Sequence, residues 1–185
     1  MTFDTRCQAI VSALATASIG GTFNQYREGP RAQLLRGRLA AYLDARTDAT
    51  ILLVGEAPGC RGARFSGIPF TSERLLTGGG PAEPTSTIVH RVLRELALEG
   101  SVLLWNVVPT HPGTASTNRP PTRAEIDAGA AFVEPLAAGR TVIAVGRVAQ
   151  RALGAPYVRH PSHGGAKEFR AGLVELLASG PPHPA

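Results

Sequence analysis

The sequence predicts a three-layer α/β/α sandwich around a central, four-stranded, mostly parallel sheet. Short, continuous apolar runs recur at residues 51–54, 101–105, 141–145 and 157–159. Such runs are typical of strands covered on both faces, because half-exposed strands alternate apolar and polar residues. Segments whose apolar residues have helical spacing lie between the runs, and this alternation is typical of a parallel sheet with helices on both faces.

The expected helices are delimited by glycine and by capping residues. Gly100 ends the helix that begins at Pro84, since glycine is common just after a helix. Thr122 and Glu125 have the spacing of a capping box at the start of the next helix. The helices are therefore expected at residues 5–18, 31–45, 84–99, 122–138 and 147–153, with a last one starting at 166.

Composition indicates one soluble globular domain. The chain has 185 residues, of which 43% are hydrophobic and 18% charged, and it contains neither internal repeats nor a dividing linker. We expect a single domain over residues 1–185, with 180–185 as a disordered tail. No apolar run approaches the ~20 residues that span a bilayer, and the N-terminus lacks a signal pattern, so we expect no membrane association and a cytoplasmic location.

The charge balance favours an anionic partner. The net charge is +5, and Lys167 is the only lysine among many arginines. Arginine suits phosphate oxygens, although codon bias also explains the missing lysines. Cys7 and Cys60 are too few for an all-cysteine iron–sulfur cluster or a four-cysteine zinc site, and the histidines lack metal-ligand spacing. We therefore expect no metal and no other cofactor.

The segment at residues 51–59 is the centre of the functional prediction. A buried strand ends in Gly55-Glu56-Ala57-Pro58-Gly59, where glycine and proline restrict the turn. Glu56 therefore follows the carboxyl end of a central strand, the place where open α/β sheets bind ligands. A solvated glutamate in an ordinary turn is the alternative for this segment alone. The long loop at 60–71 beside it is also typical of a functional region.

Polar side chains follow the ends of three expected strands. Glu56, Asn106 and His160 each come at or just after such an end. Since the carboxyl ends of parallel strands share one edge, a carboxylate, an amide and an imidazole should converge there. Each residue also has an ordinary explanation by itself. Glu56 could be solvated, Asn106 could cap a turn, and His160 could be a loop histidine whose hydrogen bonds are satisfied.

The order of these motifs resembles the uracil-DNA glycosylase superfamily, and most of all its iron–sulfur-containing branch. The resemblance covers residues 54–165. It is carried by Gly-Glu-Ala-Pro-Gly at 55–59, Gly-Ile-Pro-Phe at 67–70, Asn-Val-Val at 106–108, the segment at 118–126 and His-Pro-Ser at 160–162.

The resemblance implies a monofunctional enzyme that hydrolyses the N-glycosidic bond of flipped-out uracil in DNA, leaving an abasic site in base excision repair. Glu56 would position or deprotonate water, and His160 would stabilise the leaving base, so these are the catalytic residues. Phe70 would stack on uracil and Asn106 would read its edge. The expected substrate-binding residues are Gly55, Ala57, Pro58, Gly59, Phe70 and Asn106, and the expected DNA-binding residues are Arg61, Arg64, Arg119, Ser162, His163 and Gly164.

The chain departs from that branch in two places. The cluster cysteines are missing, so the resemblance implies no cluster here. After Gly59 the sequence reads Cys60-Arg61-Gly62 where relatives carry acidic residues, which leaves the exclusion of thymine open. We expect a monomer that acts on single- or double-stranded DNA containing uracil.

Three other functions remain open from the sequence. A non-enzymatic protein could bind uracil-containing or damaged DNA. A covalent-trapping binder is a second alternative, because His111 lies where a related branch carries its trapping histidine, although the basic insertion of that branch is missing. A nucleotide-binding module using residues 55–59 is the third, but it lacks the lysine and hydroxyl of a phosphate-binding loop.

Overall fold

The computed structural model of the chain describes residues 3–179, so the expected disordered tail at 180–185 lies outside the described residues. A four-stranded sheet forms the centre, with β1 (Ile51–Gly55), β2 (Val102–Asn106), β3 (Thr141–Val145) and β4 (Tyr157–Val158). The strand order is β2-β1-β3-β4, and all pairs are parallel. The predicted fold class is therefore confirmed, and the carboxyl ends of all four strands lie along one edge.

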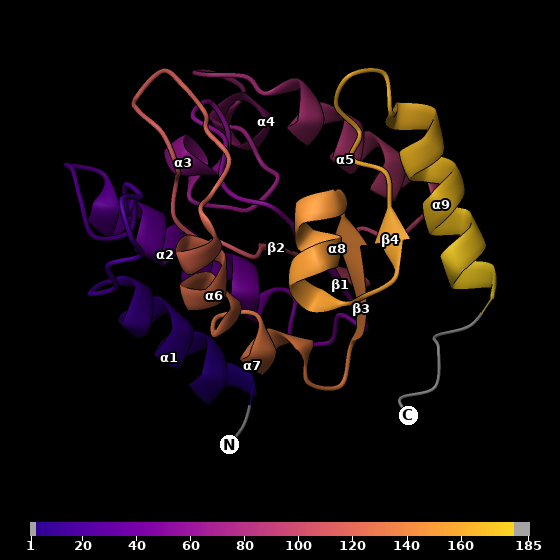
Figure 1. Ribbon diagram of the computed structural model, residues 1–185, viewed down its shortest axis with the longest axis horizontal. Helices are drawn as coiled ribbons and strands as arrows, with labels where there is room; N and C mark the ends of the chain where they lie inside the picture. Colours follow the sequence, from indigo (N-terminus) through magenta and orange to yellow (C-terminus); the bar gives the residue numbers. More distant parts are fainter. Residues whose placement is uncertain (1–2, 180–185) are drawn as a thin grey trace.

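Helices cover both faces of this sheet (Figure 1). One face packs against α1 (Phe3–Leu14), α2 (Ala32–Asp44), α6 (Arg123–Ala130), α7 (Glu134–Ala137) and α8 (Arg147–Leu153). The other face packs against α5 (Pro84–Glu95) and α9 (Ala166–Ala178). Two short helices, α3 (Ala63–Ser66) and α4 (Glu73–Thr77), lie in the connection from β1 to α5. None of the described helices has the length and apolar character needed to cross a membrane.

The two faces of the sheet bury two separate apolar cores. In β1, Leu52 and Val54 belong to the core under α1 and α2, whereas Ile51 and Leu53 belong to the core under α5 and α9. This division follows from the two-residue period of a strand, in which successive side chains point to opposite faces. All five residues of β1 are buried, which explains why its sequence is apolar without alternation.

Several element boundaries differ from the sequence-based expectation. The helix expected over 122–138 is wrong as one element, because it is divided into α6 and α7. Pro135 lies in the first turn of α7, and proline lacks the N–H that would continue a helix from α6. The capping box of Thr122 and Glu125 is confirmed. The first helix ends at Leu14 rather than at 18, and the loop at 60–71 contains α3.

Candidate active site

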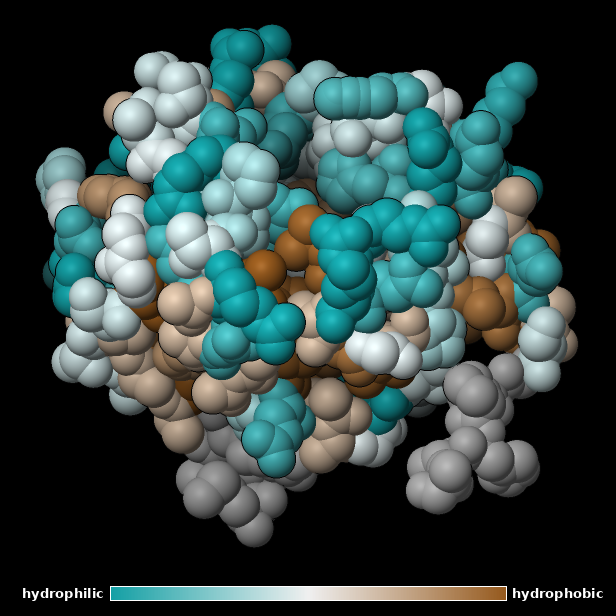
Figure 2. Space-filling view, in the orientation of Figure 1, coloured by the Kyte–Doolittle hydropathy of each residue, from teal (hydrophilic) through white to brown (hydrophobic). Residues whose placement is uncertain are grey.

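A cleft of about 530 Å³ opens at the carboxyl edge of the sheet. Near the centre of the face in Figure 2, a hollow with apolar residues at its base is bordered by hydrophilic side chains. The cleft takes residues from beyond each of the four strands. Its lining includes the sequence-predicted residues Glu56, Ala57, Pro58, Gly59, Phe70, Asn106, Arg119, His160, Ser162 and His163.

Backbone hydrogen bonds that continue past β1 and β2 fix the position of Glu56. The Val107 N–H donates to the Gly55 carbonyl at 2.9 Å, and the Val108 N–H donates to the Glu56 carbonyl at 3.0 Å. Burial raises the pKa of the Glu56 carboxyl above its ordinary value, and the charge of Arg151 opposes that shift. Within the described residues, no hydrogen bond engages the Glu56 carboxylate, which leaves it free to act on a ligand or water.

Phe70 lies in a β-turn that brings its ring against β1. The Thr71 N–H donates to the Ile68 carbonyl at 3.1 Å, Pro69 takes the second position of the turn, and Phe70 takes the third with φ of 54°. This is a type II turn, in which the third position usually holds glycine. Left-handed backbone in a non-glycine residue is costly and clusters at functional sites. Phe70 is 7% exposed, and its buried ring faces the cleft.

The Phe70 ring takes the space that a side chain at residue 55 would need. A Cβ on Gly55 would lie 2.3 Å from the Phe70 Cζ and 2.9 Å from the Asn106 Oδ1. Gly55 does not line the cleft itself, but its missing side chain lets the ring and the amide approach the strand. Gly55 also pairs with Asn106 in the sheet. Gly55 therefore contributes to the site by leaving room for the Phe70 ring and the Asn106 amide.

The Asn106 side chain is nearly enclosed, yet its amide has no partner within the described part of the chain. Asn106 is 4% exposed, and a buried amide without a hydrogen bond is rare, because desolvation without a partner is costly. Since Asn106 lines the cleft, its donor and acceptor are available to a bound molecule. An amide offers both in fixed positions.

The environment of His160 determines which ring nitrogen carries the proton. The Ser162 N–H donates to Nδ1 at 3.2 Å, and the Ser162 Oγ lies 2.7 Å from the same atom. A backbone N–H can only donate, so Nδ1 is the acceptor and Nε2 carries the proton in the neutral ring. Burial lowers the pKa of His160, and His163 lowers it further. The ring therefore presents an N–H donor to the cleft while remaining neutral near pH 7.

Only some of the predicted DNA-binding residues line the cleft. His163, at the exposed tip of the loop after β4, has φ of 51°, and Gly164 beside it has φ of 79°. Arg119 lines the cleft, but its two terminal nitrogens bond Glu125 at 2.7 and 2.6 Å. Arg64 stacks on the Phe23 ring, 4.6 Å from its centroid, while Arg61 is exposed. Neither Arg61 nor Arg64 lines the cleft.

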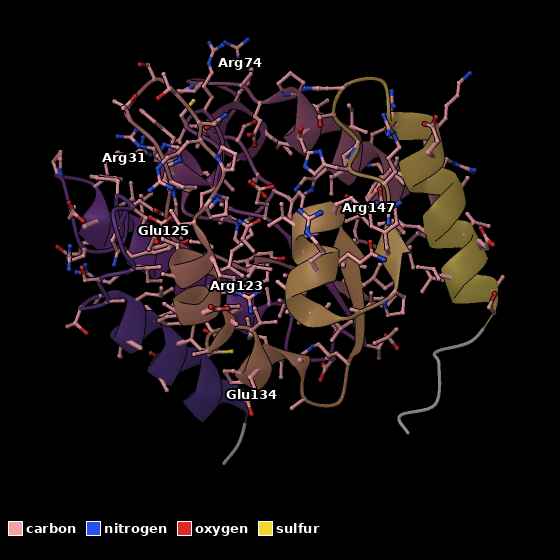
Figure 3. The ribbon with its side chains drawn as sticks, in the orientation of Figure 1. Arg31, Arg74, Arg123, Glu125, Glu134 and Arg147 are labelled. Atoms are coloured by element: carbon pink, nitrogen blue, oxygen red, sulfur yellow. The ribbon has the colours of Figure 1, made fainter. Side chains whose placement is uncertain are left out.

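Several cleft residues were not identified from the sequence. Arg147 follows β3, and Figure 3 labels it on α8. The rule that located Glu56, a polar residue after a strand end, could also have found Arg147. Glu83 gave no such signal, because it follows a glycine-rich connection. The cleft residues missed by sequence reasoning are Ala63, Glu83, Thr85, Pro112, Asn118, Val145, Gly146, Arg147 and Val148.

Comparison with known proteins identifies the family of the chain. The model of the uracil DNA glycosylase superfamily matches residues 42–185. The chain belongs to this superfamily. Its members are DNA glycosylases, hydrolases of DNA repair, so the family implies DNA as the substrate. Among curated proteins, no relative matches the chain.

Two solved structures of superfamily enzymes resemble the chain. The crystal structure of SMUG2 from Pedobacter heparinus has a TM-score of 0.69 and 14% identity over 97% of this chain and 98% of that one. This likeness supports the shared fold. UNG from Nitratifractor salsuginis matches with a TM-score of 0.45 and 18% identity, over 92% of this chain and 94% of that one.

The residues do not fit the iron–sulfur cluster of the branch that the sequence resembles. The two cysteines, Cys7 in α1 and Cys60 after the Gly-Glu-Ala-Pro-Gly motif, are both buried and form no disulfide. Four thiolates usually hold such a cluster. The described residues also contain no group of three or more histidine, cysteine or acidic residues that could hold a metal ion.

Proposed function

We propose that the protein is a monofunctional uracil-DNA glycosylase, which hydrolyses the bond between deoxyribose and a flipped-out uracil and leaves an abasic site. The observation that carries this proposal is the shared cleft of Glu56, Phe70, Asn106 and His160. The carboxylate, the amide and the imidazole Nε2 have no hydrogen-bond partner among the described residues. Their unpaired atoms match the polar edges of a pyrimidine and the water that attacks the sugar.

Phe70 and Asn106 would recognise the base. A flipped base can stack on the Phe70 ring, and such stacking contributes about 1–3 kcal/mol. The Asn106 amide would accept a hydrogen bond from uracil N3–H and donate one to O4. Cytosine presents the opposite pattern at these atoms, so it would leave buried polar groups unpaired, and unpaired buried groups give strong discrimination.

His160 would stabilise the leaving base. As the glycosidic bond breaks, negative charge develops on uracil O2, and a fixed donor aimed at that atom lowers the barrier. The Nε2 proton of the neutral ring is suited to this task, because Ser162 holds Nδ1 as an acceptor. A neutral donor stabilises the developing anion without requiring acid conditions.

Glu56 would act on the other side of the bond. The sugar becomes positively charged as the base leaves, and a carboxylate stabilises that charge and orients the attacking water. The raised pKa of Glu56 makes it a stronger base for the proton that water must lose.

The loop at residues 162–164 would enter the duplex while the base is extruded. Uracil must leave the stack to reach such a cleft, and His163 is the one bulky side chain in that loop. Arg61, Arg64 and Arg119 are proposed phosphate contacts on grounds of charge, although only Arg119 lines the cleft, and binding should weaken with salt. We expect the protein to act as a monomer in the cytoplasm, on single- or double-stranded DNA.

The environment of His111 argues against covalent trapping. Its side chain is 0% exposed, with Nδ1 2.7 Å from the Pro58 carbonyl oxygen and Nε2 2.8 Å from that of Thr114. Both ring nitrogens therefore face backbone carbonyl oxygens, and His111 does not line the cleft, so neither nitrogen is positioned to attack a sugar bound there. The contact with the Pro58 carbonyl thus ties His111 to the motif at residues 55–59.

A uracil-containing oligonucleotide tests the proposal. Incubation followed by alkali should break the strand at uracil, whereas Asn106→Ala and His160→Ala should lose most turnover while remaining folded by circular dichroism. Base release from neither single- nor double-stranded substrate would refute the proposed function. A gel shift without base release would favour a non-enzymatic binder, and an adduct that survives denaturing electrophoresis would favour trapping.

A further inference from the structure

Glu83 places a second carboxylate in the cleft. It immediately precedes α5, and its carboxylate packs directly on the segment that follows Glu56. A Cβ on Gly59 would lie 2.0 Å from the Glu83 Oε1, and a Cβ on Gly62 would lie 2.0 Å from its Oε2. The absence of side chains at both glycines is therefore what allows the carboxylate to occupy this position.

Known structural roles do not account for this carboxylate. Glu83 is the N-cap residue of α5, but its side chain makes no capping hydrogen bond. No other hydrogen bond or ion pair engages it among residues 7–179, and burial raises its pKa. Glu83 is half-buried, and removing a carboxylate from water is costly unless a partner compensates for it. A side chain held this way at a cleft wall points to a role toward the ligand.

The edges of a bound uracil limit where Glu83 can act. In the proposed function Phe70 covers one face of the base, Asn106 reads N3 and O4, His160 contacts O2, and N1 carries the sugar. The edge left uncontacted is C5–C6, adjacent to O4. Gly59, Ala63 and Glu83 line the cleft together and form a wall that none of those contacts uses.

We propose that Glu83 is a specificity-determining residue, whose carboxylate fills the space beside C5 and excludes the 5-methyl group of thymine. This inference rests on the proposed function. A methyl group entering that space would collide with the carboxylate and would also remove water from it, so both effects act against thymine. Discrimination by a single methyl group is typically about 10–200-fold.

The test measures kcat/KM for release of uracil and of thymine from otherwise identical oligonucleotides. Glu83→Ala should raise the thymine-to-uracil ratio by about 10–200-fold, whereas Glu83→Gln, which keeps the volume but removes the charge, should raise it less. Glu95→Ala is the matched control, because Glu95 is an exposed carboxylate at the opposite end of α5. Its ratio should equal that of the wild type. Since Glu83 makes no capping bond, its replacement should leave the helix folded.

A double variant tests the location of the carboxylate. The three nearest atoms to a Cβ on Gly62 all belong to Glu83, so Glu83→Ala clears the space that a side chain at residue 62 would need. Gly62→Asp in the Glu83→Ala background should refill the space and restore the exclusion of thymine. Release of uracil with an unchanged ratio in Glu83→Ala, or a wild-type kcat/KM for thymine as high as that for uracil, would overturn this inference alone. No uracil release by the wild type would overturn the proposed function and this inference together.

Discussion

Replacing Gly55 by alanine should damage the site while leaving the fold intact. The new Cβ would lie 2.3 Å from the Phe70 ring, and β1 cannot retreat because both of its edges are paired, with β2 and β3. Ordinary contact begins near 3.4 Å, so the ring must move by about 1.1 Å, the difference between these distances. The Asn106 amide, 2.9 Å from the same point, must shift as well.

The magnitude follows from these displacements. A misplacement of about 1 Å at a reacting centre can reduce the rate by roughly 100-fold, so we expect a loss of this size in kcat/KM for uracil release. Insertion of a methyl group into a packed site costs typically about 1–3 kcal/mol of unfolding free energy. Urea denaturation measures that cost with the same protein preparation.

Gly37→Ala is the matched control for this experiment. Gly37 lies in the interior of α2, and a Cβ there would meet nothing within 4 Å. Alanine should stabilise the helix by about 0.5–1 kcal/mol with activity unchanged. Wild-type activity in Gly55→Ala, with unfolding free energy also unchanged, would refute the view that the ring and the amide depend on the bare backbone at residue 55.

Three further variants test the electrostatics of the site and its surroundings. For Glu56, whose pKa is raised above the ordinary 4.5, activity should fall as pH drops through that raised value, because the base is then protonated. Glu56→Gln should be slow and lack this acid limb, and a retained limb would assign it to another group. Arg119 hydrogen bonds lower the pKa of Glu125 to about 2, so its contribution to stability is complete above pH 4.5 and lost toward pH 2. Glu125→Gln should therefore lower the unfolding free energy at pH 7 by about 1 kcal/mol or more, with the difference closing toward pH 2; a constant difference would contradict this origin. Arg147→Ala should weaken DNA binding for all sequences and reduce the salt slope by about 1 if Arg147 contacts a phosphate, whereas an unchanged slope would exclude that contact.

The convergence of Glu56, Asn106 and His160 could be predicted because it depends on local pattern and on one general rule. Apolar runs identify buried strands, and parallel strands share a carboxyl edge. The cleft contains all three residues. The division of the helix at 131–133 was also visible in principle, because Pro135 interrupts the expected helical segment.

Other features of the site depend on contacts that the sequence does not encode locally. The packing of Glu83 on Gly59 and Gly62 requires the path of the whole connection from β1 to α5. Arg119 was expected to bind phosphate, and its pairing with Glu125 arises because the loop before α6 folds back on the capping box. The left-handed conformation of Phe70 was not anticipated, since glycine is the residue that usually signals it.

Helix α5 links two parts of the cleft, the turn that carries Phe70 and the carboxylate of Glu83. His90 Nε2 lies 3.1 Å from the Thr71 Oγ1, and the Ser86 Oγ accepts the Ser72 N–H at 2.8 Å, so the turn that carries Phe70 is anchored to the same helix that Glu83 precedes. The Phe70 ring and the Glu83 carboxylate should therefore move together if α5 tilts against the sheet. If Glu83 excludes thymine as proposed, the space between the ring and the carboxylate would keep its width during such a motion, and selectivity between uracil and thymine would persist even where the rate of the reaction changes.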